Sequence, residues 1–282
     1  MSTENQLAPS ELRDFEFHFA PYCELTVDAM TFLLSYVNQL CANNHNVSFC
    51  FDAEDTIKQF DGDGFFKHLS SSVSICPVNS ISVGRSYDRI LTDRVIKLIN
   101  INADRPDQTV TPQLADAIVN AIKNSQFARR LNVAVFTIIG ELIDNILQHS
   151  STNIDGFSGV EIYNGGKLIR IAVSDSGRGI LQTLRPTLTA EFPKLNRLND
   201  TKLLIEVLKR GVSRHGQGRG CGLKTSADWA IKFGACLDIR LSNIRIVLFP
   251  DKGKYALRTP ICFGDLPDIG GTHICFTFTL DI

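Results

Sequence analysis

The chain has 282 residues, which is long for one compact core, so we expect two domains. Hydrophobic residues make up 44% of it and charged residues 21%, close to the averages of soluble globular proteins, which argues against disorder and against a coiled coil. The net charge of −1 gives no general attraction to nucleic acid or to a membrane surface, so we predict neither as a partner.

Residues 15–19 alternate in polarity like a strand, and residues 28–41 carry apolar side chains at helical spacing. Residues 46–52 have the composition of a second strand, and residues 64–69 that of a short helix. This order predicts a small β-α-β-α unit. It faintly resembles a STAS-type regulatory domain in element order alone.

Two stretches without periodicity follow this unit. Residues 77–94 are rich in Ser, Asn and Gly, and residues 102–112 have the composition of a linker. We therefore place a boundary near residue 108. The prediction is a small α/β regulatory or partner-binding domain over residues 1–108 and a second domain over residues 109–282.

The second domain begins with two long helical patterns, at residues 113–124 and 132–149. Strand patterns follow, then a polar stretch of about thirty-five residues, a glycine-rich loop and a further helix. The later strand and helix patterns fall at residues 160–163, 168–174, 223–233, 236–241, 244–249 and 273–280. We expect an α/β fold with helices over one face of a mixed β-sheet.

The eight cysteines are irregularly spaced, with no CxxC pair and no histidine cluster at zinc-ligand spacing. We expect most of them to be reduced and buried. The first twenty residues lack the basic start and apolar run of a leader peptide, and no run of about 18 apolar residues occurs. These features predict a cytoplasmic protein.

The helix at residues 132–149 combines an apolar arc with a polar face. Glu141 and Asn145 are one turn apart on the polar face, with Gln148 and His149 nearby, so a carboxylate and a carboxamide project together. The amide oxygen suits Mg²⁺, and the carboxylate can orient or deprotonate a water. The alternative is a solvated polar face. The expected apolar arc comprises Val135, Phe136, Ile139, Leu142, Ile143, Ile146 and Leu147.

A second segment, DSGRG, runs from Asp175 to Gly179 directly after a strand pattern. Gly177 and Gly179, one residue apart, permit a sharp turn, and the carboxylate of Asp175 can accept a hydrogen bond from an exocyclic amine. The alternative interpretation is an ordinary Asp-Ser-Gly turn.

The third segment places Gly216, Gly218, Gly220 and Gly222 at every second position before a helix. Close approach of a ligand to the backbone is the usual reason for such a run, and the amides of the following helix favour phosphate. The spacing is neither that of a Walker loop nor that of a Rossmann fingerprint. The alternative is a flexible glycine hinge.

In this order, ELIDN, DSGRG and GQGRGCGL, followed by Gly270-Gly271-Thr272, resemble the motifs of the GHKL superfamily. That superfamily comprises gyrase, heat-shock chaperones, histidine kinases and the MutL mismatch-repair ATPases. The resemblance covers residues 111–282 and implies an α/β sandwich of the Bergerat type. Within the superfamily the chain looks closest to small bacterial histidine-kinase-like ATP-binding proteins and anti-sigma-factor kinases.

The resemblance implies that ATP and Mg²⁺ bind. Glu141 would activate the hydrolytic water, Asn145 would bind the Mg²⁺, and Asp175 would contact the adenine amino group. Thr272 would support the Asp175 contact through water, and residues 181–215 would form a mobile lid in which Arg210 and Arg214 could meet phosphate. The glycines would shape the adenine side (Gly177, Gly179) and line the phosphates (Gly216, Gly218, Gly220, Gly222).

Three functions fit this resemblance. The first is an ATPase whose lid controls binding of a protein partner; the second is a Ser/Thr kinase of the anti-sigma type; the third is a nucleotide-gated binding module with little turnover. The chain ends just after its last strand pattern, so no later domain supplies a phosphate-sensing lysine and we expect slow hydrolysis. No helix carries the histidine, acidic residue and proline of a phosphoacceptor, and the sequence predicts no particular oligomeric state.

Overall fold

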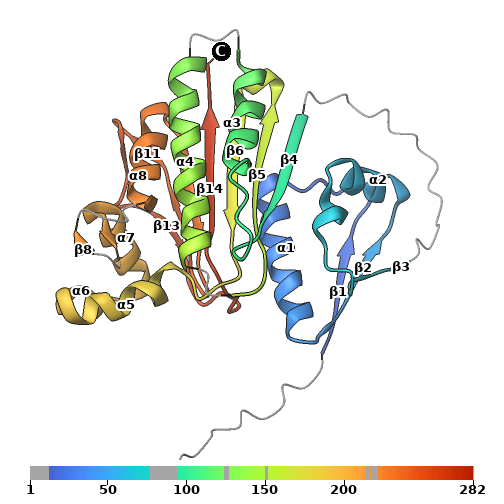
Figure 1. Ribbon diagram of the computed structural model, residues 1–282, viewed down its shortest axis with the longest axis horizontal. Helices are drawn as coiled ribbons and strands as arrows, with labels where there is room; N and C mark the ends of the chain where they lie inside the picture. The colour runs from blue at the N-terminus through green and yellow to red at the C-terminus, as the bar shows by residue number, and fades with distance from the viewer. Residues whose placement is uncertain are drawn as a thin grey trace, which may run out of the picture.

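The computed structural model describes residues 13–76, 94–123, 127–149, 152–213, 216–217 and 222–281. A small parallel sheet in the order β1-β2-β3 forms the N-terminal unit, beside the main sheet (Figure 1). The predicted strand, helix and strand at its start are confirmed, whereas the helix at residues 54–62 was not predicted. The unit contains β1 (Asp14–Phe19), α1 (Val27–Ala42), β2 (Asn46–Phe51), α2 (Glu54–Gly62), the 3₁₀ helix η1 (Phe65–His68) and β3 (Ser74–Cys76).

Within the described residues, the main sheet has seven strands in the order β13-β10-β9-β14-β6-β5-β4, and every neighbouring pair is antiparallel. The predicted α/β class is confirmed, but this sheet is antiparallel rather than mixed. Its strands are β4 (Arg94–Ile101), β5 (Gly156–Tyr163), β6 (Leu168–Ser174), β9 (Cys236–Arg240), β10 (Arg245–Leu248), β13 (Ile261–Phe263) and β14 (His273–Thr279). Short elements complete the connections: η2 (Asn164–Gly166), β7 (Val212–Ser213), β8 (Gly216–Gln217), β11 (Pro250–Asp251) and β12 (Lys254–Tyr255).

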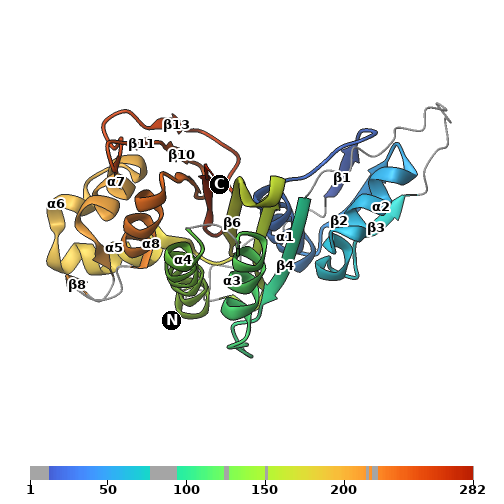
Figure 2. The same cartoon turned by 90° about the horizontal axis from the view of Figure 1, so that it is seen from above.

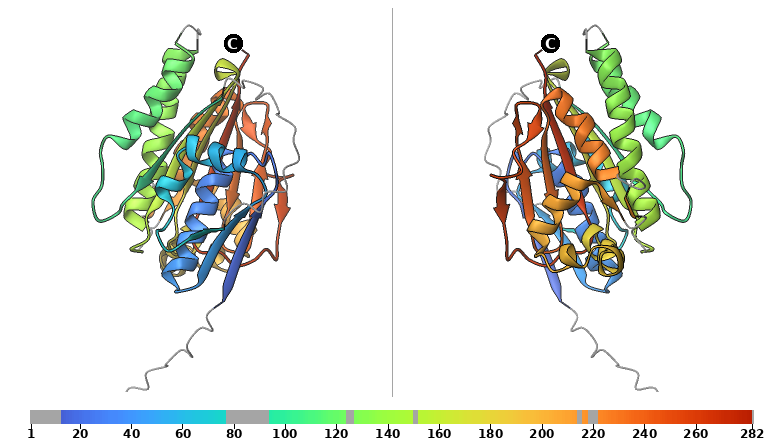
Figure 3. Two further views of the ribbon diagram at one scale, coloured as in Figure 1. Left: turned by 90° about the vertical axis from the view of Figure 1, so that its right-hand side faces the viewer. Right: turned by 90° about the vertical axis from the view of Figure 1, so that its left-hand side faces the viewer.

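Helices cover one face of the main sheet (Figures 2 and 3). The helices α3 and α4 lie side by side on this face, and α8 packs against α4. The other helices follow β6 and complete this layer at one end of the sheet. The bounds are α3 (Val110–Ala121), α4 (Ala128–His149), α5 (Ile180–Glu191), α6 (Pro193–Asn196), α7 (Asp200–Arg210), α8 (Gly222–Ala230) and the 3₁₀ helix η3 (Ile231–Phe233).

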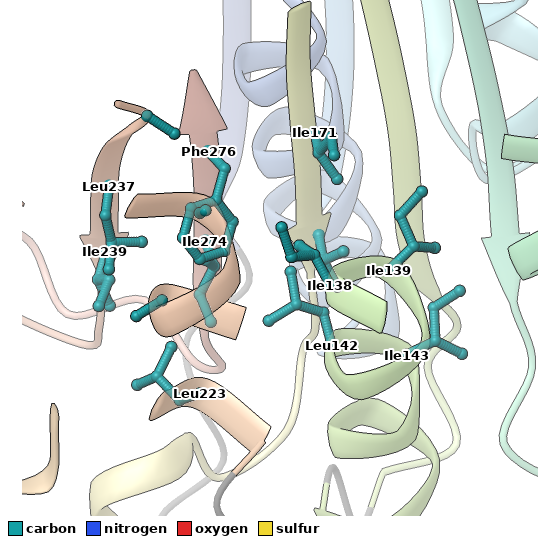
Figure 4. Packing of buried hydrophobic residues seen from close by; sticks show 14 of the residues in the cluster. Ile138, Ile139, Leu142, Ile143, Ile171, Leu223, Leu237, Ile239, Ile274 and Phe276 are labelled. Atoms are coloured by element: carbon teal, nitrogen blue, oxygen red, sulfur yellow. The ribbon is translucent and has the colours of Figure 1, made fainter. Parts of the chain in front are cut away.

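The main core lies between α4 and the sheet, where Ile138 and Leu142 of α4 face Ile171, Ile274 and other strand residues (Figure 4). By length and composition alone α4 could cross a membrane, yet its apolar stripe is the centre of this core. One expectation for the helix was wrong. Phe136 does not join the core and is 49% exposed, because it falls at the edge of the stripe, whereas Leu131 and Ala134 are fully buried.

The opposite face of the main sheet is covered in part by α1 of the N-terminal unit. Alternation along β6 sends Ile171 and Val173 toward α4, while Ala172 packs with Val27 of α1. The hydroxyl of Ser174 donates to that of Thr31 at 3.0 Å. The main sheet is therefore the middle of three layers at this point.

An aromatic core joins the N-terminal unit to the main sheet. Phe19, Phe49 and Phe60 pack there with Leu98 of β4 and Phe157 of β5. Strand β4 precedes the boundary predicted near residue 108 and yet pairs along its length with β5. The main sheet thus includes a strand that the sequence did not predict.

A buried charge cluster lies at the same junction. Glu161 of β5 accepts from Arg94 at 2.7 Å and from Arg170 at 2.8 Å, and Arg94 also donates to Asp63 at 3.3 Å. Each buried charge has an opposite partner, which offsets the cost of removing it from water. The cluster ties the loop after α2 to the edge of the main sheet.

The polar stretch predicted as a lid is largely helical. The side chain of Asn199 caps α7 by accepting from the backbone of Lys202 at 3.0 Å, and Gly211, with φ of 64°, ends it. Apolar residues of α5, α6 and α7 belong to the main core, including Leu184, Leu195 and Leu204. These helices were not predicted, although the buried residues of α7, Leu203, Leu204, Val207 and Leu208, recur at helical spacing.

The expectation that most cysteines are buried was wrong. Among the described cysteines only Cys275 is buried, Cys262 is exposed, and the others are half-buried. Cys221 lies outside the described residues.

Candidate functional site

Asp175 lies directly after β6, where the chain leaves the main sheet. Its carboxylate accepts from the backbone amide of Gly177 at 2.7 Å and from that of Thr272 at 3.1 Å. The hydroxyl of Thr272 hydrogen-bonds the same carboxylate. Thr272 thus contacts the carboxylate directly and fixes it in place, while its predicted water-mediated role in the contact of Asp175 with adenine stays a prediction.

Burial raises the pKa of Asp175 to about 6, although the hydrogen bonds from Gly177 and Thr272 oppose the shift. The carboxylate is thus mainly ionised at neutral pH and becomes protonated in weak acid. A carboxylate held in this way is ready to accept from a polar hydrogen of a ligand.

Thr272 also connects two of the predicted segments. Its hydroxyl accepts from the backbone amide of Ile180 at 3.0 Å, at the start of α5, and its carbonyl accepts from the amide of Asp175 at 3.0 Å. The preceding residue, Gly271, has φ of 97°, and a Cβ there would lie 1.8 Å from the carbonyl oxygen of Asp175. Only glycine allows the two segments to approach so closely.

Glu141 and Asn145 lie one turn apart on α4 and face the first residue of α8, Gly222. A Cβ at Gly222 would lie 2.8 Å from Glu141 Oε2 and 3.3 Å from Asn145 Nδ2. Because Gly222 has no side chain, the N-terminus of α8 can lie directly against the side chains of Glu141 and Asn145. Burial, and then the nearby charge of Asp144, raise the pKa of Glu141 above its usual value, which makes it a stronger base.

A small cavity joins the two halves of the site, with a volume of about 30 Å³. Asn145, Asp175, Gly179 and Thr272 line it together with apolar side chains. The amide nitrogen of Asn145 is buried and has no hydrogen-bond partner in the described structure. The apolar lining, which the motifs did not predict, comprises Leu142, Ile146, Val173, Ile180 and Ile274.

Some of the other predicted site residues lie within the described structure and some do not. Gly177 and Gly179 lie in the turn after β6, and Gly216 lies in the short strand β8. Arg210 is paired with Glu206 at 2.7 Å within α7. Gly218, Gly220 and Arg214 lie outside the described residues, as does the side chain of His149.

Helix α1 contributes contacts to the site that were not predicted. Gln39 donates to the carbonyl of Gly270 at 3.1 Å and accepts from its amide at 3.1 Å. The hydroxyl of Ser35 donates to the carbonyl of Asp175 at 3.1 Å and lies 2.8 Å from that of Ser176. Nothing in the local sequence marks these two polar residues, because their partners are more than a hundred residues away. Through these contacts, α1 of the N-terminal unit holds the segments that carry Asp175 and Gly270.

The family described as Histidine kinase-, DNA gyrase B-, and HSP90-like ATPase matches residues 130–282. The chain belongs to this family. The predicted GHKL membership is thereby confirmed, and with it an ATP-binding ATPase domain that includes the cavity and its lining from α4, β6 and β14. The match begins within α4, so it does not include β4 or the N-terminal unit. No curated protein matches the chain.

Proposed function

We propose that the chain binds ATP with Mg²⁺ in this cavity and hydrolyses the ATP slowly. The observation that carries the proposal is the convergence of Asp175, Thr272 and Asn145 on one cavity, with Glu141 and the N-terminus of α8 at its side. A carboxylate fixed by backbone amides suits the amino group of adenine, and the start of a helix suits phosphate. The cavity of about 30 Å³ admits only a water or two, so an adenine ring enters as its walls separate.

Asp175→Asn is expected to weaken ATP binding about 10- to 100-fold, because a charge-assisted hydrogen bond contributes about 1.5–3 kcal/mol. The amide nitrogen of an asparagine would also face a donor, the backbone amide of Gly177 or Thr272, where the carboxylate now accepts. Titration with a fluorescent ATP analogue measures the loss, and an unchanged affinity would contradict the assignment.

The same carboxylate should make adenosine binding depend on pH. Adenosine has no phosphate group to titrate, so a fall in its affinity below about pH 6 reports the protonation of Asp175. The direction follows from the raised pKa: the ionised form that accepts from the amino group is present above it and is lost below it. The Asp175→Asn variant should show no such dependence over the same pH range.

Asn145 is the candidate Mg²⁺ ligand because its side chain lines the cavity, where its carbonyl oxygen is the only atom able to bind a cation; the unpaired atom is the amide nitrogen, which can only donate a hydrogen bond. A bound Mg²⁺ would neutralise charge on the phosphate oxygens. Asn145 Oδ1 would be the ligand, leaving the amide nitrogen to donate toward a phosphate oxygen. The side-chain amide of Asn145 lies against Gly222, which is the first residue of α8.

For hydrolysis, Glu141 is the candidate general base. Water attacks the terminal phosphorus, its proton passes to the Glu141 carboxylate, and the bond to the bridging oxygen breaks to leave ADP and phosphate. The raised pKa of Glu141 favours this proton transfer. Among the described residues near the glycine segment, Arg210 and Lys224 are paired with Glu206 and Asp228 in their own helices.

We also propose that α1 couples the nucleotide site to a protein partner bound at the N-terminal unit, while α5–α7 close over the nucleotide. The contacts of Gln39 with both backbone groups of Gly270 support the coupling. Gln39→Ala is expected to weaken nucleotide binding about 3- to 10-fold, since it leaves the half-buried amide and carbonyl of Gly270 without their side-chain partner. Asn43→Ala, on an exposed residue at the end of the same helix, is the control. Equal nucleotide affinities of the two variants would exclude coupling through Gln39.

A further inference from the structure

The outer face of the small parallel sheet gathers side chains of types that can act as metal ligands. Along β1, Phe15, Phe17 and Phe19 point into the aromatic core, so alternation places Glu16 and His18 on the other face, where their side chains are 62% and 64% exposed. The same alternation on β2 buries Val47, Phe49 and Phe51 and leaves Cys50 on the outer face. The small sheet therefore has one apolar face and one polar face.

Strand register places three of these side chains in one row. His18 of β1 is the direct neighbour of Cys50 on β2, and Cys50 is the direct neighbour of Cys76 on β3. Glu16 lies two residues before His18, on the same face of the same strand. Neighbouring strands in a sheet are about 4.8 Å apart, so a row of this kind holds its side chains within reach of one ion.

The ligand atoms are already close together. One oxygen of Glu16 lies 3.3 Å from Nε2 of His18, and the sulfurs of Cys50 and Cys76 are 2.9 Å apart. The ligand atoms of Glu16, His18 and Cys50 all lie within 4.8 Å of one another, and Cys76 adjoins this group through its contact with Cys50 rather than belonging to it. Two sulfurs, one imidazole nitrogen and one carboxylate oxygen make a donor set typical of zinc, whose sites are tetrahedral.

We propose that Glu16, His18, Cys50 and Cys76 bind one zinc ion across the three strands of the N-terminal sheet. With Zn–S bonds of about 2.3 Å, tetrahedral geometry sets the two sulfurs about 3.8 Å apart. The sulfurs therefore separate by about 1 Å on binding, which a small rotation of each cysteine side chain provides. All four positions around the ion are then filled by protein, as in structural rather than catalytic zinc sites.

Such a site would hold β3 to the other two strands. Strand β3 has only three residues and, within the part of the chain that the structure describes, pairs with β2 alone. The spacing of 32 residues between His18 and Cys50 and of 26 residues between Cys50 and Cys76 matches no sequence pattern for zinc, which explains why the sequence did not predict the site. The zinc site is independent of ATP binding, and either can fail without the other.

The test uses the full chain, reduced with a phosphine, freed of metal and titrated with Zn²⁺ against a coloured chelator. We expect one zinc ion per chain. Cys50→Ser, Cys76→Ser and His18→Ala should each lower the affinity at least about 100-fold, since losing even an outer contact of a metal ligand costs 10- to 100-fold. Cys23→Ser and Cys41→Ser, half-buried cysteines away from the row, should leave it unchanged.

Co²⁺ in place of Zn²⁺ gives a second measurement. An intense near-ultraviolet band from thiolate-to-cobalt charge transfer is expected with the reduced chain, and it should weaken in either cysteine variant. Circular dichroism separates loss of the site from loss of the fold in each variant. Failure of the reduced chain to bind Zn²⁺, or Co²⁺ binding without a thiolate band, would overturn the proposal. A disulfide between Cys50 and Cys76 in the protein as isolated from cells, with no zinc, would overturn it as well.

Discussion

Glu141→Gln is expected to lower the rate of ATP hydrolysis about 100- to 10,000-fold while changing ATP affinity little, because a general base contributes about that factor. Glutamine has the same shape, so it fills the same space beside Gly222, where Glu141 Oε2 now lies. It cannot accept the proton of the attacking water. Phosphate release at saturating ATP measures the rate, and a fluorescent-nucleotide titration measures the affinity.

Asp144→Asn is the matched control for this variant. Asp144 precedes Asn145 on α4, is exposed, and acts on Glu141 only through its charge, which raises the pKa of Glu141 less than burial does. Its removal should change the hydrolysis rate by no more than about threefold, since exposed charges interact weakly. Equal rates for Glu141→Gln and the unmodified chain would assign the released phosphate to a contaminant and favour a nucleotide-gated binding module.

The same assay separates hydrolysis from phosphotransfer. In a Ser/Thr kinase, Glu141 would take the proton of a hydroxyl on a partner protein instead of a water proton. ATP labelled in its terminal phosphate should therefore release labelled phosphate in the absence of any partner if the chain is an ATPase. Label on a partner protein without free phosphate would contradict the proposed hydrolysis and support the kinase.

The local sequence pattern was sufficient to predict those elements whose structure depends on residues that are close in the sequence. Helical spacing placed Glu141 and Asn145 on one side of α4 and the apolar stripe on the other, as the buried Ile139 and Leu142 confirm. The strand before Asp175 and the helix after Gly222 were likewise predicted. In these segments the motif residues lie within or directly beside the helix or strand that holds them, so one local pattern predicts both the motif and the secondary structure.

Distant contacts explain what the sequence did not predict. Strand β4 depends on pairing with β5, about sixty residues later, and its apolar residues are divided between two cores, with Leu98 in one and Ile101 in the other. Ser35 and Gln39 look like ordinary polar residues of a helix until Asp175 and Gly270 are placed beside them. Where both faces of a sheet are covered, side chains on both sides of a strand are buried, so the strand's sequence does not alternate between apolar and polar residues.

The approach of Gly271 to Asp175 makes Gly271→Ala the most destabilising single change that we expect at the site. A Cβ would lie 1.8 Å from the carbonyl oxygen of Asp175 and 2.6 Å from its carbonyl carbon, and the backbone φ of 97° is unfavourable for any residue with a side chain. Both clashing atoms are backbone atoms. The segment therefore cannot make room by rotating a side chain, and the hydrogen bonds between Asp175 and Thr272 must break.

We expect Gly271→Ala to lose about 4 kcal/mol or more of unfolding free energy, with a fall in Tm of about 10 °C or more, together with nucleotide binding. Gly253→Ala separates the clash from the strain, because Gly253 also has a positive φ, of 76°, but has no atom within 4 Å of the added carbon. Gly253 lies in the turn between β11 and β12, where alanine should cost only about 1 kcal/mol and leave nucleotide binding intact. Thermal unfolding and nucleotide titration of both variants check this. If the two variants prove equally stable, the backbone conformation rather than the contact with Asp175 is what requires glycine at position 271.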